Sequence, residues 1–492
     1  MKKISHGRRT AGIARCAALI TAAAAVPGIF AGCGGKSPSD GEPVSIEIWH
    51  YYNGSLQNSF DKMIENFNNT VGAENNITVS AHSQGSIADL ETAVLNSAQK
   101  QVGSSELPDI FASYADTAFE VKKMGILAEL DAYFSPEEQA DYIDSYIEEG
   151  RIGSGGELYI FPIAKCTETF MLNKTEWDAF AEATGASADD MRTMEGITDT
   201  ARRYYEWTDS LTPDVPNDGK AFYGRDALAN MFIIGSKQLG HEMFRVENGS
   251  LSVDVDESAM RKIWDNYYVP YISGYFRADG KYRSDDVKVG NIISLIGSTS
   301  SAVYFPEEVT DSSGSHAIEA EILPMPVFEG GQAVSVQQGA GMVVTKSTPE
   351  EEAAAVMFLK WFTEPENNIA FSAESGYLPV KKRANDYDYY METAQKLGLT
   401  VTATNDMVIK EAFSRISQSE LYTSKAFDGS QGARRILEYG LADKAAADRE
   451  AVAELVAGGA SLDEAVAQYN TDENFAEWYS QLKADLDAAV NQ

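Results

Sequence analysis

Residues that could carry out catalysis are scarce in this chain of 492 residues. The sequence has no zinc-binding helix with histidines at i and i+4, no P-loop and no Gly-x-Ser-x-Gly elbow. Residues 97–100 (Ser-Ala-Gln-Lys) match a serine acyltransferase motif but lack its companion motifs, and residues 217–219 (Asn-Asp-Gly) lack the other ligands of a calcium loop. Acidic residues are so frequent that a glycosidase-like carboxylate pair has little specificity. The sequence therefore favours binding over catalysis, with no cofactor and no metal.

Aromatic residues beside small polar residues, at the ends of expected strands, are more informative. A sugar ring has apolar faces that aromatic rings cover, and hydroxyls that carboxylates and amides bind. The alternative is that such aromatics pack in the core, which we favour for Trp49. The candidate residues of this kind are Tyr52, Tyr114, Asp116, Ser298, Ser300 and Tyr304.

Two further features could bind an anion. Residues 297–301 (Gly-Ser-Thr-Ser-Ser) could present hydroxyls and backbone N–H groups to a phosphate at a helix start, or they could be a plain serine-rich helix cap. Arg434 could bind an anionic ligand in a bidentate manner, or it could be a surface ion-pair partner.

The expected elements place the strand-end residues on one sheet edge. The pattern predicts strands at 44–49, 76–80 and 108–111, with helices between them. This β-α-β-α-β order predicts a parallel sheet covered by helices, whose ligands lie beyond the carboxyl ends of the strands. Further strands are expected at 158–163, 169–172 and 340–345, and the chain is largely helical from residue 404.

The start of the chain predicts export. Basic residues, an apolar run of about a dozen residues and small residues before Cys33 are typical of a signal peptide, and the run is shorter than the roughly 20 residues of a membrane span. Residues 30–33 (Phe-Ala-Gly-Cys) resemble the bacterial lipobox, with Phe30 in place of leucine. We therefore expect a signal peptide at 1–32, lipidation of Cys33, a flexible tether over 33–43 and a location on the outer face of the cytoplasmic membrane. An ordinary cleaved signal is the alternative.

Composition limits the partners. Without residues 1–32, which carry five basic and no acidic residues, 35 basic residues face 74 acidic ones, so nucleic acid is not an expected partner. The remaining length predicts two or more core-bearing units. Of the three cysteines, Cys16 leaves with the signal and Cys33 is the lipid site, so Cys166 has no partner for an intramolecular disulfide.

Six short runs occur in an order that is specific to one protein family. They are residues 46–50 (Ile-Glu-Ile-Trp-His), 107–110 (Leu-Pro-Asp-Ile), 125–131 (Gly-Ile-Leu-Ala-Glu-Leu-Asp), 158–162 (Leu-Tyr-Ile-Phe-Pro), 358–363 (Phe-Leu-Lys-Trp-Phe-Thr) and 376–380 (Gly-Tyr-Leu-Pro-Val). Over about 44–490 the chain resembles the extracellular solute-binding proteins of bacterial ABC importers, in their carbohydrate-binding group.

This resemblance implies an α/β, two-lobed periplasmic-binding-protein-like fold of type II, with a ligand cleft between the lobes. Lobe one would comprise 44–163 and 304–345, and lobe two 164–303 and 346–492. The closed form would deliver its ligand to a membrane permease, so the resemblance implies a binding protein, not an enzyme, which we expect to be a monomer. A surface glycoside hydrolase and an adhesin are the alternatives from other classes.

The resemblance also implies site residues. The order of motifs is similar to that of sn-glycerol-3-phosphate-binding members. In that comparison four residues match ligand-contacting positions, Tyr114 and Asp116 fall in a contact loop, and Cys166 replaces a serine contact between Lys165 and Thr167. Ile87 and Met194 replace an aromatic pair, so a sugar or oligosaccharide is the first expectation, and sn-glycerol-3-phosphate or a glycerophosphodiester the second. The four matching residues are Ser298, Gly339, Tyr377 and Arg434.

Overall fold

The computed structural model of the protein describes residues 43–247, 249–312 and 314–491. The predicted signal peptide, the lipidation at Cys33 and all of the tether except Pro43 lie outside the described residues. Among the helices that are described, none is both long and apolar enough to cross a membrane.

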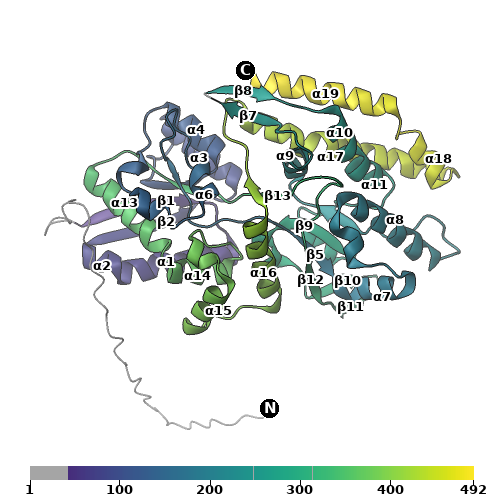
Figure 1. Ribbon diagram of the computed structural model, residues 1–492, viewed down its shortest axis with the longest axis horizontal. Helices are drawn as coiled ribbons and strands as arrows, with labels where there is room; N and C mark the ends of the chain where they lie inside the picture. The colour runs from purple at the N-terminus through teal and green to yellow at the C-terminus, as the bar shows by residue number, and fades with distance from the viewer. Residues whose placement is uncertain (1–42, 248, 313, 492) are drawn as a thin grey trace, which may run out of the picture. The chain divides into compact units, whose positions relative to one another are not determined.

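The first sheet has the strand order β2-β1-β3-β14-β4 (Figure 1). As predicted, β1 pairs in parallel with β2 and β3, whereas β14 runs antiparallel to β3 and β4. The strands are β1 (Val44–His50), β2 (Ile77–Ser83), β3 (Ile110–Ser113), β14 (Gly341–Val344) and β4 (Ile160–Phe161). The helices whose buried residues join this core are α1 (Gly54–Asn69), α3 (Ile87–Ala98), α4 (Ala115–Lys123), α6 (Asp144–Glu149), α13 (Pro349–Phe362) and α14 (Pro365–Ser375). We call this sheet with its core the first lobe.

A second sheet, of order β12-β5-β9-β6, has a separate core. Its strands are β12 (Ala320–Leu323), β5 (Glu168–Asn173), β9 (Ser294–Ser298) and β6 (Tyr223–Arg225). The helices in this core are α7 (Lys174–Thr184), α8 (Met194–Ser210), α9 (Leu228–Gln238), α10 (Glu257–Ile263), α11 (Val269–Ile272), α17 (Ser430–Ala457), α18 (Leu462–Ala467) and α19 (Asp472–Val490). We call this sheet with its core the second lobe.

The remaining elements are short or form satellite clusters. Helices α15 and α16 pack on part of α14 in a small core of their own. They and the other elements are α2 (Val71–Asn75), α5 (Pro136–Gln139), α12 (Arg283–Lys288), α15 (Tyr387–Lys396), α16 (Ala403–Gln418), the 3₁₀ turn η4 (Thr299–Tyr304), β7 (Phe244–Glu247), β8 (Ser250–Val253), β10 (Glu308–Asp311), β11 (Gly314–Ala317), β13 (Val334–Val336) and β15 (Glu420–Tyr422).

The packing of two segments differs from the predicted lobe boundaries. We expected 304–345 in lobe one, but β12 pairs antiparallel with β5 in the second sheet. We expected 346–492 in lobe two, but α13 contributes Phe358 and Phe362 to the first core. Both apolar segments could pack on either sheet, and the periodicity of a single sequence does not specify the partner.

Two stretches of chain, 162–167 and 337–340, pass between the lobes and pair with each other, and the first of them also pairs with residues 376–380 of the first lobe. The backbone of Cys166 exchanges hydrogen bonds with Gln338, and that of Lys165 exchanges them with Leu378. The segments 162–167, 337–340 and 376–380 therefore lie together, and they bring candidate site residues from distant parts of the sequence to one place.

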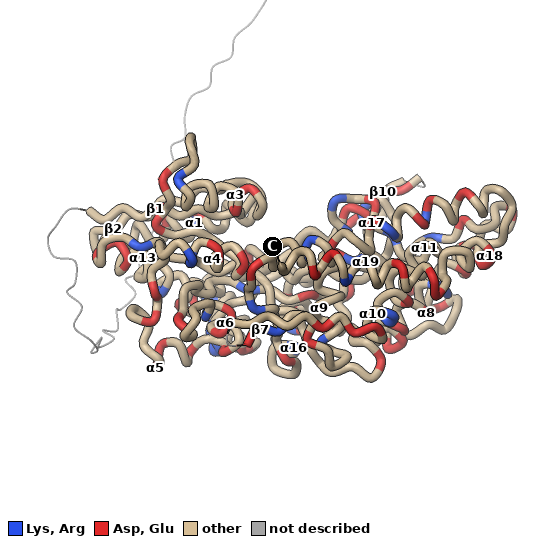
Figure 2. The backbone as a smooth tube through the Cα atoms, turned by 90° about the horizontal axis from the view of Figure 1, so that it is seen from above, with Lys and Arg blue, Asp and Glu red and all other residues tan. Residues whose placement is uncertain are grey.

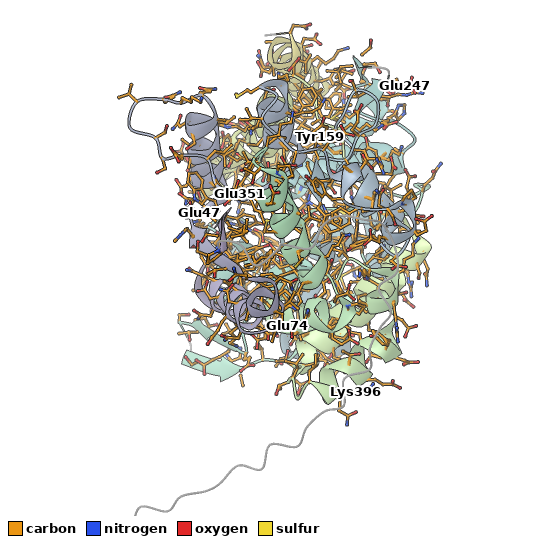
Figure 3. All side chains as sticks on the ribbon, turned by 90° about the vertical axis from the view of Figure 1, so that its left-hand side faces the viewer. Glu47, Glu74, Tyr159, Glu247, Glu351 and Lys396 are labelled. Carbon is orange, nitrogen blue, oxygen red and sulfur yellow. The ribbon has the colours of Figure 1, made fainter. Side chains whose placement is uncertain are left out.

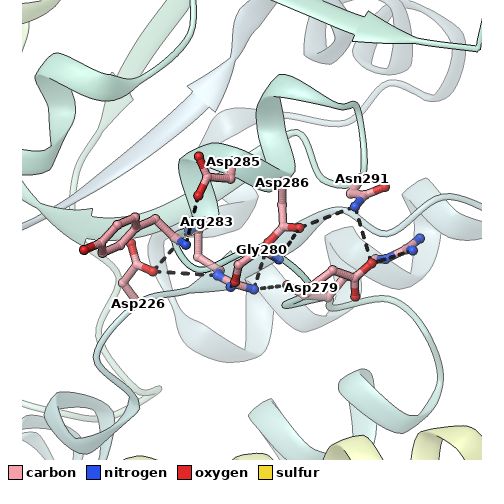
Figure 4. Close-up of polar contacts among 9 residues, drawn as sticks. Asp226, Asp279, Gly280, Arg283, Asp285, Asp286 and Asn291 are labelled. Atoms are coloured by element: carbon pink, nitrogen blue, oxygen red, sulfur yellow. Dashed lines mark hydrogen bonds and ion pairs between the residues drawn. The ribbon is translucent and has the colours of Figure 1, made fainter.

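A buried arginine anchors the loop before α12 in the second lobe (Figure 4). Arg283 forms an ion pair with Asp286 at 2.8 Å and lies 3.7 Å from a carboxylate oxygen of Asp226. Asp286 also accepts a hydrogen bond from the backbone of Gly280. These ion pairs compensate the buried charges at the start of α12.

The surface is acidic, with a formal net charge of −34 for the whole chain. Figure 2 shows Asp and Glu on helices of both lobes, with Lys and Arg among them. Exposed carboxylates include Glu74 and Glu247, which Figure 3 labels. Such a surface disfavours nucleic acid as a partner.

Candidate functional site

A cluster of four tyrosines lies where β1 and β3 end, beside the loop that follows α14. Tyr51 and Tyr377 approach within 3.2 Å through their hydroxyls, and the rings of Tyr52 and Tyr377 lie 6.2 Å apart. Burial raises the pKa of each of these phenols, and neighbouring tyrosines raise the pKa of Tyr51, Tyr52 and Tyr377 further. We call Tyr51, Tyr52, Tyr114 and Tyr377 the tyrosine cluster.

The members of the cluster differ in exposure. Tyr52 is 1% exposed and its ring packs on His50 and Phe60, so most of it belongs to the first core. Tyr51 and Tyr114 are partly exposed. These two therefore offer more ring surface to a ligand than Tyr52, which we had expected to stack on it.

The crossing segment 165–167 contributes polar groups that already have partners. Lys165 forms a buried ion pair with Glu149 at 2.7 Å and donates to the backbone oxygen of Gly339. The Thr167 hydroxyl donates to the backbone oxygen of Val336. Lys165 and Thr167 thus hold the crossing segments together, and their contact with a ligand stays a prediction.

Cys166 is buried among the same residues. Burial raises the pKa of its thiol to about 12, and Ser300 and Gln338 are close enough to oppose that rise by hydrogen bonding. The thiolate is therefore scarce at neutral pH, and Cys166 is a poor nucleophile.

Ser298 caps the short turn η4. Its hydroxyl accepts a hydrogen bond from the backbone N–H of Ser301 and lies 2.9 Å from the hydroxyl of Ser300. This is the geometry of a serine-rich helix cap, the alternative to an anion nest. Tyr304, at the end of the turn, is 50% exposed.

Gly339 has φ of 103°, and a β-carbon there would lie 3.0 Å from the Ala164 backbone oxygen.

Asp116 and Arg434 approach the cluster from α4 and α17. The carboxylate of Asp116 accepts a hydrogen bond from the Ser430 hydroxyl at 2.6 Å. Burial raises the pKa of Asp116, although the hydrogen bond and the charge of Arg434 partly oppose it. Arg434 is exposed and also acts electrostatically on Tyr114, so its guanidinium lies near the tyrosine cluster.

Sequence reasoning missed the residue that orients Arg434. Asn230, only 1% exposed, accepts a hydrogen bond from Arg434 at 2.8 Å. Its amide nitrogen donates to Glu168 at 3.0 Å and to Gln338 at 3.1 Å. Glu168 in turn forms an ion pair with Arg225 at 2.6 Å. Since an ionised carboxylate only accepts, the amide of Asn230 must face Glu168 and its oxygen must face Arg434.

One signal could have drawn attention to this network. Glu168 begins strand β5, in which every residue is buried, and its side chain is 4% exposed. A charge in such a strand requires a buried partner. The partners Arg225 and Asn230 lie too far along the sequence for a single chain to reveal them.

A small cavity of about 30 Å³ adjoins this network. Its lining includes Met194, Arg225, Asn230 and Ser335. The Arg225 Nε and the Ser335 hydroxyl have no hydrogen-bond partner within the described part of the chain. The cavity is large enough for a water molecule, and both of these residues line it.

The structure thus brings most predicted site residues to one region. The tyrosine cluster, the crossing segments and Arg434 meet there with hydrogen-bonding groups from both lobes, without a nucleophile of lowered pKa. Residues 62–398 match the family described as bacterial extracellular solute-binding protein. The chain belongs to this family.

Solved structures with the same fold support the two-lobed architecture of this solute-binding protein. The cyclic α-maltosyl-1,6-maltose binding protein of Arthrobacter globiformis has a TM-score of 0.62 at 19% identity, covering 91% of this chain and 99% of that one. UgpB of Mycobacterium tuberculosis, in complex with glycerophosphocholine, has a TM-score of 0.60 at 20% identity, with the same coverage. The maltotriose binding protein of Thermus thermophilus has a TM-score of 0.56 at 15% identity, covering 91% and 100%. No protein with a curated description matches the sequence significantly.

The environment of His50, which lies beneath the tyrosine cluster, predicts that the free energy of unfolding depends on pH. Its side chain is buried, its Nδ1 accepts from the backbone of Tyr52, and burial lowers its pKa to about 4. In the unfolded chain the imidazole has its ordinary pKa near 6.5, so it binds a proton more readily there than in the folded state. The free energy of unfolding should therefore fall by about 3 kcal/mol as the pH falls from 6.5 to 4. Urea unfolding across this range measures the loss. The His50→Gln variant should lack this component, and an identical pH dependence in the variant would contradict the assignment.

Proposed function

We propose that this solute-binding protein captures a sugar or oligosaccharide between its two lobes and delivers it unchanged to an ABC permease. In this proposal Cys33 carries the lipid anchor, the body faces outward as a monomer, and no reaction follows binding. The observation that carries the proposal is the convergence of partly exposed tyrosines and hydrogen-bonding groups from both lobes at one place. Sugar rings need such a combination of flat apolar surface and polar side chains.

The ligand would contact groups from several segments. Tyr51, Tyr114 and Tyr377 would cover the apolar face of the ring. Arg434 would bind hydroxyls of the sugar. Polar groups of the crossing segments would bind others, where these groups exchange their present partners for the ligand. The other predicted site residues would border the ligand; they are Tyr52, Asp116, Lys165, Cys166, Thr167, Ser298, Ser300, Tyr304 and Gly339.

The local charge favours a neutral ligand. Glu91 and Asp116 lie close enough to influence one another, and burial raises the pKa of both. Glu149 acts on Tyr114 in the same region. A phosphate monoester would bring further negative charge beside these carboxyls, which costs free energy in a partly buried site.

A glycerophosphodiester is the second candidate. Arg434 forms no ion pair with any residue that the structure describes, and its hydrogen-bond partner Asn230 is neutral. Its charge is therefore available to a phosphodiester, which carries a single negative charge. The similar fold of UgpB, solved with glycerophosphocholine, supports including this compound in a test.

Thermal unfolding in the presence of candidate ligands tests the proposal. A ligand that binds only the folded protein stabilises it by about 2.7 kcal/mol at one hundred times its Kd. We expect maltotriose or a related oligosaccharide to raise Tm, and sn-glycerol 3-phosphate to have a smaller effect. A response to glycerophosphocholine alone would favour the second candidate. The absence of a shift with any sugar or phosphodiester would contradict the proposal.

Product analysis separates binding from catalysis. Labelled oligosaccharides incubated with the protein should be recovered intact, because the site holds no activated nucleophile among the described residues. Turnover would support a surface glycoside hydrolase instead. Permease genes beside this gene would argue against an adhesin.

A further inference from the structure

Two helices that belong to different cores meet beside the candidate site. Helix α4 contributes Ala118 and Val121 to the core of the first lobe. Helix α17 contributes Ala433 and Leu437 to the core of the second lobe. The N-terminal turn of α17 therefore reaches from one lobe to the other.

Three polar contacts join these helices. The hydroxyl of Ser430 donates to Asp116 at 2.6 Å, and the amide of Gln431 donates to the hydroxyl of Thr117 at 2.9 Å. An ion pair between Lys123 and Asp428 lies at the outer end of the contact. We call these three pairs the α4–α17 latch.

The backbone at the start of α17 packs closely against α19. Gly429, which precedes α17, has φ of 86°, and a β-carbon there would lie 2.0 Å from the backbone oxygen of Ala489 in α19. The first turn of α17 is thus packed against the C-terminal end of α19, and it moves with the second lobe. Its N-terminal partial positive charge also faces the carboxylate of Asp116.

The same two helix starts carry residues of the candidate site. Tyr114 is the N-cap residue of α4, two positions before Asp116. Arg434 lies one turn after Ser430 in α17. Contact between the helix starts therefore fixes the distance between Tyr114 of one lobe and Arg434 of the other.

We propose that Ser430, Gln431 and Thr117 are positioning residues that hold the lobes closed and thereby place Arg434 opposite Tyr114. The consequence for affinity rests on the proposed function, whereas the effect on closure does not. The exposed ion pair of Lys123 contributes little, because surface ion pairs are weakened by water and salt. The hydrogen bond to the half-buried carboxylate of Asp116 contributes most.

Small-angle scattering on the purified protein without added ligand tests closure directly. The Ser430→Ala/Gln431→Met variant removes both hydrogen-bond donors while keeping helix-forming residues of similar size. We expect the ratio of closed to open molecules to fall about tenfold, which increases the radius of gyration. The matched control is Arg435→Gln, an exposed position on the same helix that has no place in the latch.

Affinity gives the second measurement. Maltotriose should bind the latch variant about tenfold more weakly than the parent protein, mainly through faster dissociation, because the competent state is less populated. A failure of maltotriose to bind the parent would count against the proposed ligand class only, and scattering would still decide on the latch. A radius of gyration equal to that of the parent and of Arg435→Gln, with an intact circular dichroism spectrum, would overturn the latch. The single variant Gln431→Met is used if the double variant does not fold.

Discussion

Replacing Glu168 by alanine is expected to lower the free energy of unfolding by about 3–5 kcal/mol. The side chains of Glu168 and Arg225 are each 4% exposed and form an ion pair at 2.6 Å. Without the carboxylate, the guanidinium of Arg225 stays buried with no opposing charge at that position, and the amide of Asn230 loses an acceptor. Urea unfolding at neutral pH, followed by circular dichroism and by tryptophan fluorescence, measures the change.

An exposed ion pair provides the control for this prediction. Lys382 and Asp144 lie 2.8 Å apart with side-chain exposures of 51% and 84%. Lys382→Ala should change the free energy of unfolding by about 1 kcal/mol or less. If Glu168→Ala were no more destabilising than Lys382→Ala, the buried pair would not have the role described here.

Local patterns in the sequence were sufficient for the first sheet. The alternation over residues 44–49 predicted a strand, and β1 forms there with Ile46 and Ile48 buried. Trp49 is 5% exposed, in agreement with the core packing that we favoured for it. These predictions succeed because strand period and helix period reflect which side chains are buried within one element.

The assignment of segments to lobes needed information that local patterns lack. Strand β12 pairs with β5, and α13 packs on the first core, although the predicted boundaries placed each of them in the other lobe. A single amphipathic helix or edge strand shows that it has a buried face but not what covers it. The family resemblance supplied the two-lobed architecture and left the boundaries inexact.

The same limit applies to the candidate site. Tyr114 and Arg434 stood out from the sequence because of their residue types and their neighbours, and the family resemblance indicated Tyr377. Asn230 lies in an apolar helix and has no distinctive neighbours, so only the fold reveals its contact with Arg434. Residues that orient a site through buried hydrogen bonds carry no local motif of their own.

Replacing Arg434 by methionine is expected to weaken ligand binding by about 10–150-fold, because hydrogen bonds to a charged group contribute about 1.5–3 kcal/mol. Because the substitution also leaves the buried oxygen of Asn230 without its donor, the free energy of unfolding should fall by about 1–3 kcal/mol, with the fold retained. Isothermal titration with the ligand found in the thermal screen measures the affinity. Arg435→Gln, on the next position of the same helix, should bind like the parent protein.

The choice of substitution also distinguishes the two candidate ligands. Arg434→Lys keeps the positive charge but loses the planar pair of donors that Asn230 orients. A phosphodiester is attracted by charge at either residue, so the lysine variant should retain much of that affinity. A neutral sugar depends on directed hydrogen bonds, so its binding should fall nearly as far in Arg434→Lys as in Arg434→Met. If the parent and both variants bound the ligand equally, Arg434 would not be a ligand-binding residue. The buried network beneath it would then have no role in orienting a ligand contact.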